Sequence, residues 1–413
     1  MHQLATAVPR PDVERTDSGM DQQPAKLWTK NFFLAIVVNL FISMVFYLLM
    51  TTMALYAVDR FQASDTAAGF ASSAFVLGSV IARIFAGRLL DIVGRRRLIL
   101  VTMAIFVVAS LLYIPTGSLA WLLVLRIVHG MAFGAGTTAV AASAQTLIPH
   151  ARRGEGTGYF GLSTTLSTAV GPFVGVLLAG LGNYHAMFYF CAAASVAALV
   201  VALFLRVPEL PAAISPGRFR MTLSDIFETA ALPISCVILL TGAAYSGILT
   251  FLTSYAETRG SAASASVFFM VYAGAVLVSR LFAGRIQDRR GDNSVMYPTL
   301  ISFVLGLLLL IPEPTILTIV GSAIFSGIGF GTVMSGAQAI AVKVSPTMRI
   351  GTATSTFFLM LDIGGGLGPI VLGALIPVLD YPGMYLMLAV VMVLATLLYF
   401  FAHGRNGGRA VRA

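Results

Sequence analysis

The feature that most limits the fold of this chain is a series of long apolar runs separated by short polar segments. A transmembrane helix needs about 20 mainly apolar residues, and most of the runs approach or exceed that length. Because lipid offers the backbone no hydrogen bonds, such spans must be helical. We therefore predict an all-α membrane protein with twelve transmembrane helices, at residues 31–58, 66–87, 98–115, 118–142, 154–180, 185–206, 231–255, 263–284, 296–312, 315–341, 350–377 and 382–403.

Composition excludes several other classes of protein. Charged residues make up 10% of the chain, whereas a soluble domain carries about 25%, so there is too little polar material to cover a water-facing surface. The two cysteines, Cys191 and Cys236, both lie inside apolar runs. They form neither a disulfide framework nor a metal-binding spacing, and we expect no metal site.

The basic residues fall mostly on one side of the predicted membrane. With the N-terminus placed inside, 21 of the 26 lysines and arginines lie on that side, in the tails and loops. Cytoplasmic loops carry such an excess, so we expect both termini in the cytoplasm. The net charge of +9 is then a topology signal. It does not indicate nucleic-acid binding, because the basic residues are not interleaved with aromatic ones.

The chain also repeats itself at a constant lag of 197 residues. The stretch ARIFAGRLLDIVGRR from Ala82 returns as SRLFAGRIQDRRGDN from Ser279, and Gly171-Pro172 returns as Gly368-Pro369. We predict two six-helix bundles related as parallel repeats, a plan suited to alternating access. The expected division is a disordered cytoplasmic tail at 1–30, an N-terminal bundle at 31–206, a cytoplasmic linker at 207–230, a C-terminal bundle at 231–403 and a cytoplasmic tail at 404–413.

Three stretches carry a resemblance to the major facilitator superfamily, over essentially everything after residue 30. GRLLDIVGRRR from Gly87 matches that family's pattern between its second and third helices. LRIVHGMAFGA from Leu125 is similar to its fourth-helix motif, and GLSTTLSTAVGPFVG from Gly161 resembles its fifth-helix Gly-Pro motif. The resemblance points to the bacterial drug- and metabolite-efflux branch, and it implies an inner-membrane secondary transporter.

The repeated basic phrase is expected to form a conformational latch that holds the cytoplasmic side shut. Three of its residues follow a spacing of four and so share one helix face: Arg83, Gly87 and Asp91 in the first copy. The family pattern places Asp91 against the helix N-terminus near Gly351, and the internal symmetry places Asp288 near Gly154. We assign to this latch Arg83, Gly87, Asp91, Arg95, Arg280, Gly284 and Asp288. The alternative is that the arginines only set topology or snorkel to the surface.

The remaining candidate residues are expected either to let helices bend or to line the substrate cavity. Gly171, Pro172, Gly368 and Pro369 are expected to let two helices at the interface bend, or simply to pack closely. Polar candidates for the substrate cavity are Asn39, Tyr47, His129, Tyr245 and Gln338. His129 has a plainer alternative as a packing histidine.

One carboxylate lies deep within a predicted span. Asp362 is about eleven residues into its span, or roughly 16 Å at about 1.5 Å per residue, near the bilayer midplane. Its equivalent in the first half is Thr165, so the repeat does not require an acid there. Intramembrane charges are functional candidates by default. We expect Asp362 to carry protons, or else to bind a cationic group of the substrate, with Arg126 as its partner; the alternative is a structural hydrogen bond.

The sequence thus favours a monomeric transporter that exports a small, partly apolar compound in exchange for protons. The alternative is a proton-coupled symporter or uniporter importing a sugar or an organic acid; a transceptor or lipid-handling scaffold is a more distant one. No nucleotide-binding or catalytic motif is present, so we expect no enzymatic activity and no cofactor beyond the proton gradient.

Overall fold

The computed structural model describes residues 26–180, 184–209, 226–258, 262–312 and 315–405, and the described residues are almost entirely helical. The first bundle comprises α1 (Lys30–Phe61), α2 (Asp65–Val93), α3 (Arg95–Leu112), α4 (Leu119–Leu147), α5 (Arg153–Gly180) and α6 (Tyr184–Phe204). The second comprises α8 (Leu232–Thr258), α9 (Ala262–Arg290), α10 (Asn293–Leu308), α11 (Ile316–Lys343) and α12 (Ile350–Tyr399). Short 3-10 turns at His150–Arg152 and Thr347–Arg349 precede α5 and α12, and a π-helical turn at Phe400–Gly404 follows α12.

The last element contains two of the expected helices. Asp380 has φ 56° and ψ 174°, which interrupts the helical backbone between Pro377 and Pro382. Proline removes a backbone donor and clashes with the preceding turn, so a break is expected there. With α12 divided at this break, the described part of the chain contains the twelve long helices that the apolar runs predict.

The same turn occurs in both halves where the repeated phrase ends. Gly94 follows α2 with φ +86°, and Gly291 follows α9 with φ +87°. A residue with a side chain rarely adopts this backbone conformation, so glycine is required at both positions. The two glycines are 197 residues apart, which shows that the repeat is structural.

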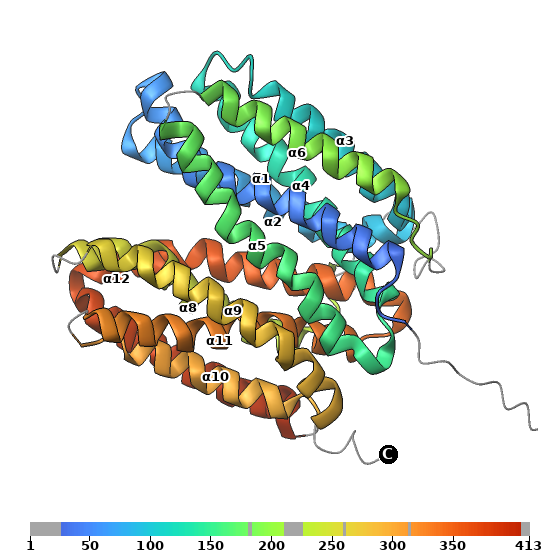
Figure 1. Cartoon of the computed structure of the whole chain (residues 1–413), viewed down its shortest axis with the longest axis vertical. Helices are drawn as coiled ribbons and strands as arrows, with labels where there is room; N and C mark the ends of the chain where they lie inside the picture. Colours follow the sequence, from blue (N-terminus) through green and yellow to red (C-terminus); the bar gives the residue numbers. More distant parts are fainter. Residues whose placement is uncertain (1–25, 181–183, 210–225, 259–261, 313–314, 406–413) are drawn as a thin grey trace, which may run out of the picture.

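Figure 1 shows two bundles of roughly parallel helices lying side by side, with the described ends of the chain at the same end of the molecule. One cluster of buried apolar side chains lies mainly within α1–α6 and a second within α8–α12. Seven helices of the described chain, one of them the joined α12, are long and apolar enough to cross a membrane. The predicted boundary at 207–230 stays a prediction, since residues 210–225 lie outside the described ones.

Candidate functional site

The two bundles touch along two equivalent lines. A Cβ atom built on Gly87 of α2 would lie 2.8 Å from the Cα of Thr352 in α12. At the matching positions, a Cβ built on Gly284 of α9 would lie 2.6 Å from the Cα of Glu155 in α5. Both glycines therefore allow helix backbones from different bundles to approach closely. We call this end of the molecule the latch end, and it is closed in this structure.

Asp288 closes the second of these lines with charged hydrogen bonds. Its carboxylate accepts the backbone N–H of Gly154 at 2.7 Å and that of Glu155 at 2.8 Å. These are free donors in the first turn of α5, where the helix dipole favours a negative charge. Glu155 in turn pairs with Arg285 across the boundary and with Arg152 beside it, both at 2.7 Å. The geometry is that expected for Asp288.

At the latch end the first line is closed by packing; farther along α2, Ser355 of α12 donates to the backbone oxygen of Arg83. Among the described residues, none donates a hydrogen bond to Asp91, although Leu90 beside it packs on Gly351. The backbone N–H of Arg95 donates to Glu209 at 2.8 Å, so the start of α3 is capped by the segment that follows α6. In this conformation Asp91 therefore accepts no capping hydrogen bond from α12, although it interacts with the charge of Arg349 directly before that helix.

A central cavity of about 110 Å³ lies between the bundles. Its wall is largely aromatic and aliphatic, with polar groups at a few points: Asn39, Ser43, Phe46, Tyr47, Val76, Ser79, Arg83, Phe133, Thr137, Phe160, Gly161, Thr164, Met334, Gln338, Phe358, Leu361 and Asp362. An apolar wall with few polar groups is typical of small-molecule sites, although drug-sized ligands usually need about 300–1,000 Å³. The cavity as it stands suits a small compound.

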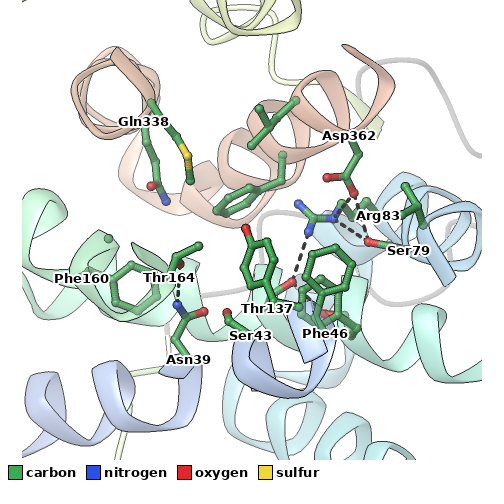
Figure 2. Close-up of a pocket in the computed structure, with 17 residues that line it drawn as sticks. Asn39, Ser43, Phe46, Ser79, Arg83, Thr137, Phe160, Thr164, Gln338 and Asp362 are labelled. Carbon is green, nitrogen blue, oxygen red and sulfur yellow. Dashed lines mark hydrogen bonds and ion pairs between the residues drawn. The ribbon is translucent and has the colours of Figure 1, made fainter. Parts of the chain in front are cut away.

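An ion pair crosses the boundary at the wall of this cavity. Nε of Arg83 lies 3.0 Å from Oδ2 of Asp362, and Figure 2 shows the two side chains pointing toward each other. Ser79 donates to the same carboxylate oxygen at 3.1 Å, and Thr137 accepts from Nη2 of Arg83 at 3.4 Å. The ring of Phe358 lies against the guanidinium, 4.7 Å from its centroid. Arg83 is thus a cavity residue as well as a member of the repeated phrase.

This geometry corrects the partner that we expected for Asp362. Arg126 is fully buried within the first bundle, where its guanidinium donates to the backbone oxygens of Ala71 at 2.8 Å and Ser72 at 3.0 Å. It also lies 4.8 Å from the ring centroid of Phe75. Its side chain therefore points into the first bundle rather than toward the cavity.

The other predicted cavity residues divide into two groups. Asn39, Tyr47 and Gln338 line the cavity. His129 instead lies in the core of the first bundle, where its ring nitrogens contact Tyr113 at 3.2 Å and Ser110 at 3.3 Å. This is the packing alternative.

Tyr245 belongs to the core of the second bundle. It stacks on Phe330 at 3.9 Å between ring centroids. Among the described residues, it is not one that lines the cavity.

The paired glycines and prolines lie where helices meet inside each bundle. A Cβ on Gly171 would approach the backbone oxygen of Met44 in α1 to 2.9 Å, and one on Gly368 would meet Ser246 of α8. Pro172 and Pro369 lie inside α5 and α12. Close packing is therefore observed, while the bending assigned to these residues remains a prediction.

Several wall residues escaped the sequence analysis. Ser79 and Thr137 could have been found, since Ser79 precedes Arg83 by one helical turn on the same face. The aromatic wall residues Phe46, Phe133, Phe160 and Phe358 carry no signal that separates them from lipid-facing phenylalanines. In the described part of the chain, no group of histidine, cysteine or acidic residues could hold a metal ion.

Comparison with known proteins agrees with this architecture. The model of the Major Facilitator Superfamily matches residues 35–318 and 234–411. The chain belongs to this superfamily. Its members are transporters rather than enzymes, so the chain is a membrane transporter of a small molecule that works without a cofactor.

Three relatives are similar over most of their length. An MFS-type transporter of Methanocaldococcus jannaschii, itself uncharacterised, is 28% identical over 344 residues, 81% of this chain and 88% of the relative. The staphylopine export protein of Staphylococcus aureus is 23% identical over 82% of this chain and 87% of its own. Multidrug resistance protein D of Escherichia coli is 25% identical over 71% and 76%.

Two solved structures share the fold. The human organic anion transporter MFSD10 superposes with a TM-score of 0.74 at 15% identity, over 91% of this chain and 100% of that one. A proton:xylose symporter gives 0.73 at 14% identity, over 90% and 94%. At this identity the likeness concerns the fold alone.

Proposed function

We propose that the protein exports a small, partly apolar compound across a bacterial inner membrane in exchange for protons, with both termini in the cytoplasm and as a monomer. The latch end is then the cytoplasmic end. The names of two relatives, an export protein and a multidrug resistance protein, favour export. The observation that carries the proposal is the ion pair between Arg83 and Asp362.

The ion pair places the proposed proton site, Asp362, directly at the contact between the two bundles. Arg83 belongs to α2 and Asp362 to α12, so their attraction holds the two bundles together beside the cavity. A proton on Asp362 removes its charge and leaves Arg83 without that partner. Breaking a buried ion pair typically costs about 3–5 kcal/mol, so protonation favours separation of α2 from α12 and opening of the latch end.

Exchange follows when the substrate has the opposite effect. A protonated carrier opens to the cytoplasm and releases its proton there. A substrate that bridges the bundles inside the cavity favours closure of the latch end and is carried outward. A ligand shifts such an equilibrium only through its different affinity for the two states. Proton and substrate then drive the carrier in opposite directions.

The second candidate is a proton-coupled importer of an organic acid. It is favoured by a second buried arginine, Arg280, as a partner for the anion, since a proton on Asp362 removes the negative charge that would repel an anion in the cavity. Purified protein in proteoliposomes separates the two. With the protein oriented so that its cytoplasmic end faces the medium, exchange accumulates substrate when the lumen is the more acidic side. Accumulation that requires the opposite pH gradient would contradict export by exchange.

A further inference from the structure

Arg280 of α9 is the internal counterpart of Arg83, 197 residues along the chain. The packing around the two arginines follows the same lag, because Gly87 meets Thr352 while Gly284 meets Glu155. Both arginine side chains are 4% exposed. Arg83 and Arg280 therefore occupy equivalent places on the two contact lines between the bundles.

The residues that bind the side chain of Arg83 have no chemically similar counterparts at the repeat positions around Arg280. Counterparts of the serine, threonine and aspartate that bind Arg83, each at the lag of 197, are Val276, Met334 and Thr165. The counterpart of the ring that covers Arg83 is Gly161. Neither the carboxylate nor the aromatic ring of the first site is thus present at the second.

Arg280 is therefore a buried cation with few hydrogen-bond partners among the described residues. Its Nε donates to the backbone oxygen of Gly331 at 3.3 Å, and its Nη1 is buried without a hydrogen-bond partner, as is Nη1 of Arg83. The two sites differ in the carboxylate, which only Arg83 has. No described carboxylate forms an ion pair with it. Leaving a charge buried and unpaired costs several kcal/mol, so a site of this kind favours an added anion.

The guanidinium of Arg280 packs directly behind the cavity wall, against Gly161. A Cβ atom on Gly161 would lie 2.5 Å from Nη1 of Arg280, and Gly161 is itself part of the cavity wall. A second wall nitrogen, Nε2 of Gln338, is also buried without a partner. Both unsatisfied groups are donors, so the ligand that completes the site must supply acceptors.

We propose that the transported compound is a small aromatic carboxylate. Its carboxylate binds Arg280, as Asp362 binds Arg83, and its ring lies in the cavity against the aromatic wall, to which Phe160 of α5 contributes. The aromatic wall of the cavity suits such a ring. The inference rests on the proposed function in one respect, namely that this cavity is the transport site.

Such a substrate would also supply the bridge that exchange requires. Arg280 belongs to the second bundle, whereas Gly161 belongs to α5 of the first. A carboxylate held by Arg280 with its ring against α5 therefore joins the bundles at the second contact line. A proton on Asp362 breaks the ion pair between the bundles at the first contact line, whereas the bound substrate joins the bundles at the second. Proton and substrate therefore have opposite effects on the latch end.

Binding of three simple probes to the purified full-length protein tests the inference. Calorimetric titration in lipid nanodiscs compares benzoate with benzamide, which keeps the ring without the charge, and with acetate, which keeps the charge without the ring. We expect benzoate to bind at least ten-fold more tightly than either. Equal binding of benzoate and benzamide, or no detectable benzoate binding, would overturn the proposal.

Two variants and a matched control locate the site. Arg280→Gln removes the cation, and Thr165→Asp supplies the missing carboxylate from the chain itself. Each should weaken benzoate binding at least ten-fold, whereas Arg289→Gln, at an exposed arginine on the same helix, should leave it unchanged. Thr165→Asp should also raise the melting temperature, which keeps the test valid if Arg280→Gln fails to fold. Benzoate binding of wild-type strength in Thr165→Asp would place the anion elsewhere.

Measurements of binding and of flux on the same purified protein distinguish a failure of this inference from a failure of the proposed function. Charge-selective binding that depends on Arg280, without flux driven by a pH gradient, would count against proton exchange alone. Proton-driven flux of a cationic or neutral compound, with no binding of benzoate, would count against the carboxylate alone.

Discussion

Asp362 of α12 lies 3.0 Å from Arg83 of α2, and this ion pair joins the two bundles at the wall of the central cavity. The carboxylate is the only side chain of an acidic residue among the described residues that line the cavity. It is therefore the group through which a proton can act on both the substrate site and the contact between the bundles.

Asp362→Asn should abolish transport driven by a pH gradient and spare folding. The amide keeps the shape and can still accept from Arg83, but it cannot titrate. We expect substrate accumulation in proteoliposomes to fall at least ten-fold, with near-normal expression and substrate exchange. Asp59→Asn, at an exposed carboxylate that accepts from Tyr184, is the control. Accumulation at the wild-type rate by Asp362→Asn would show that this carboxylate carries no coupled proton.

The two latch carboxylates should differ in strength. Asp288 accepts two backbone N–H groups of α5, whereas no described residue donates to Asp91. A carboxylate at a helix N-terminus contributes about 0.3–2 kcal/mol, which is a several-fold change of population for two states of similar energy. Asp288→Asn should therefore open the latch end several-fold more than Asp91→Asn does.

Spin labels at the exposed Arg97 and Arg290, one in each bundle, report this opening as a change in distance distribution. Equal distributions for Asp288→Asn and Asp91→Asn would mean that the hydrogen bonds to α5 do not hold the latch end closed. A larger effect of Asp91→Asn would mean that α2 and α12 form the stronger line.

The sequence predicted the helices well because their signal is local. Each apolar run and each break at glycine or proline is contained within about 30 residues, and the break at Asp380 falls between the two last predicted spans. Asp288 was placed correctly because a helix N-terminus at a known symmetry position offers only one kind of partner.

The partner of Asp362 could not be predicted in the same way. Depth along a helix follows from counting residues, but the face that a helix turns toward the cavity depends on packing against all its neighbours. Arg126 and Arg83 are both embedded arginines in the first half, and only the packing of α2 against α12 brings Arg83 to Asp362. A comparison of the residues around Arg83 with those at the repeat positions around Arg280 would have shown, from the sequence alone, that Arg280 lacks the acidic partner.

Topology can be tested by labelling single cysteines. Positions 62 and 405 are both exposed, and the proposed orientation puts Gln62 outside the cell and Arg405 in the cytoplasm. In a variant without Cys191 and Cys236, a membrane-impermeant maleimide should label a cysteine at position 62 in intact cells and one at position 405 only after permeabilisation. Labelling of both positions in intact cells would contradict an even number of spans with cytoplasmic ends.

A buried aspartate, Asp292, should make the end of the last helix sensitive to acid. Burial raises the pKa of Asp292, but hydrogen bonds from His403 and Gln287 and the charge of Lys343 outweigh this, so its pKa lies below the usual value. His403 lies 2.9 Å from this carboxylate and connects it to the turn that follows α12.

Because the folded-state pKa of Asp292 is depressed, its stabilisation is present above the unfolded pKa of about 4 and is lost as the pH falls below it. The protection factors of residues 399–405, which correct hydrogen exchange for its intrinsic pH dependence, should therefore be high at pH 7 and lower near pH 3. Asp292→Asn should lower these protection factors at pH 7 by about ten- to one-hundred-fold, for a loss of about 1.5–3 kcal/mol, and change them little near pH 3. An equal effect at both pH values would show that the charge of Asp292 does not hold this turn.

The close approach of α9 to α5 leads to a final prediction about Gly284. A Cβ atom at this position would meet the backbone oxygen of Gly154 and would lie 2.6 Å from the Cα of Glu155. Backbone atoms cannot move aside as a flexible side chain can, and overpacking of this kind costs about 1–3 kcal/mol. Gly284→Ala should therefore separate the bundles at the latch end and shift the population toward the open state about ten-fold, without unfolding either bundle. Gly274→Ala is the matched control, because it lies on the same helix and a Cβ there would meet nothing within 4 Å. Distances between the labels at positions 97 and 290 should lengthen for Gly284→Ala and stay as in the wild type for Gly274→Ala. If Gly284→Ala keeps the wild-type distances and melting temperature, the two backbones do not need to meet for the latch end to close.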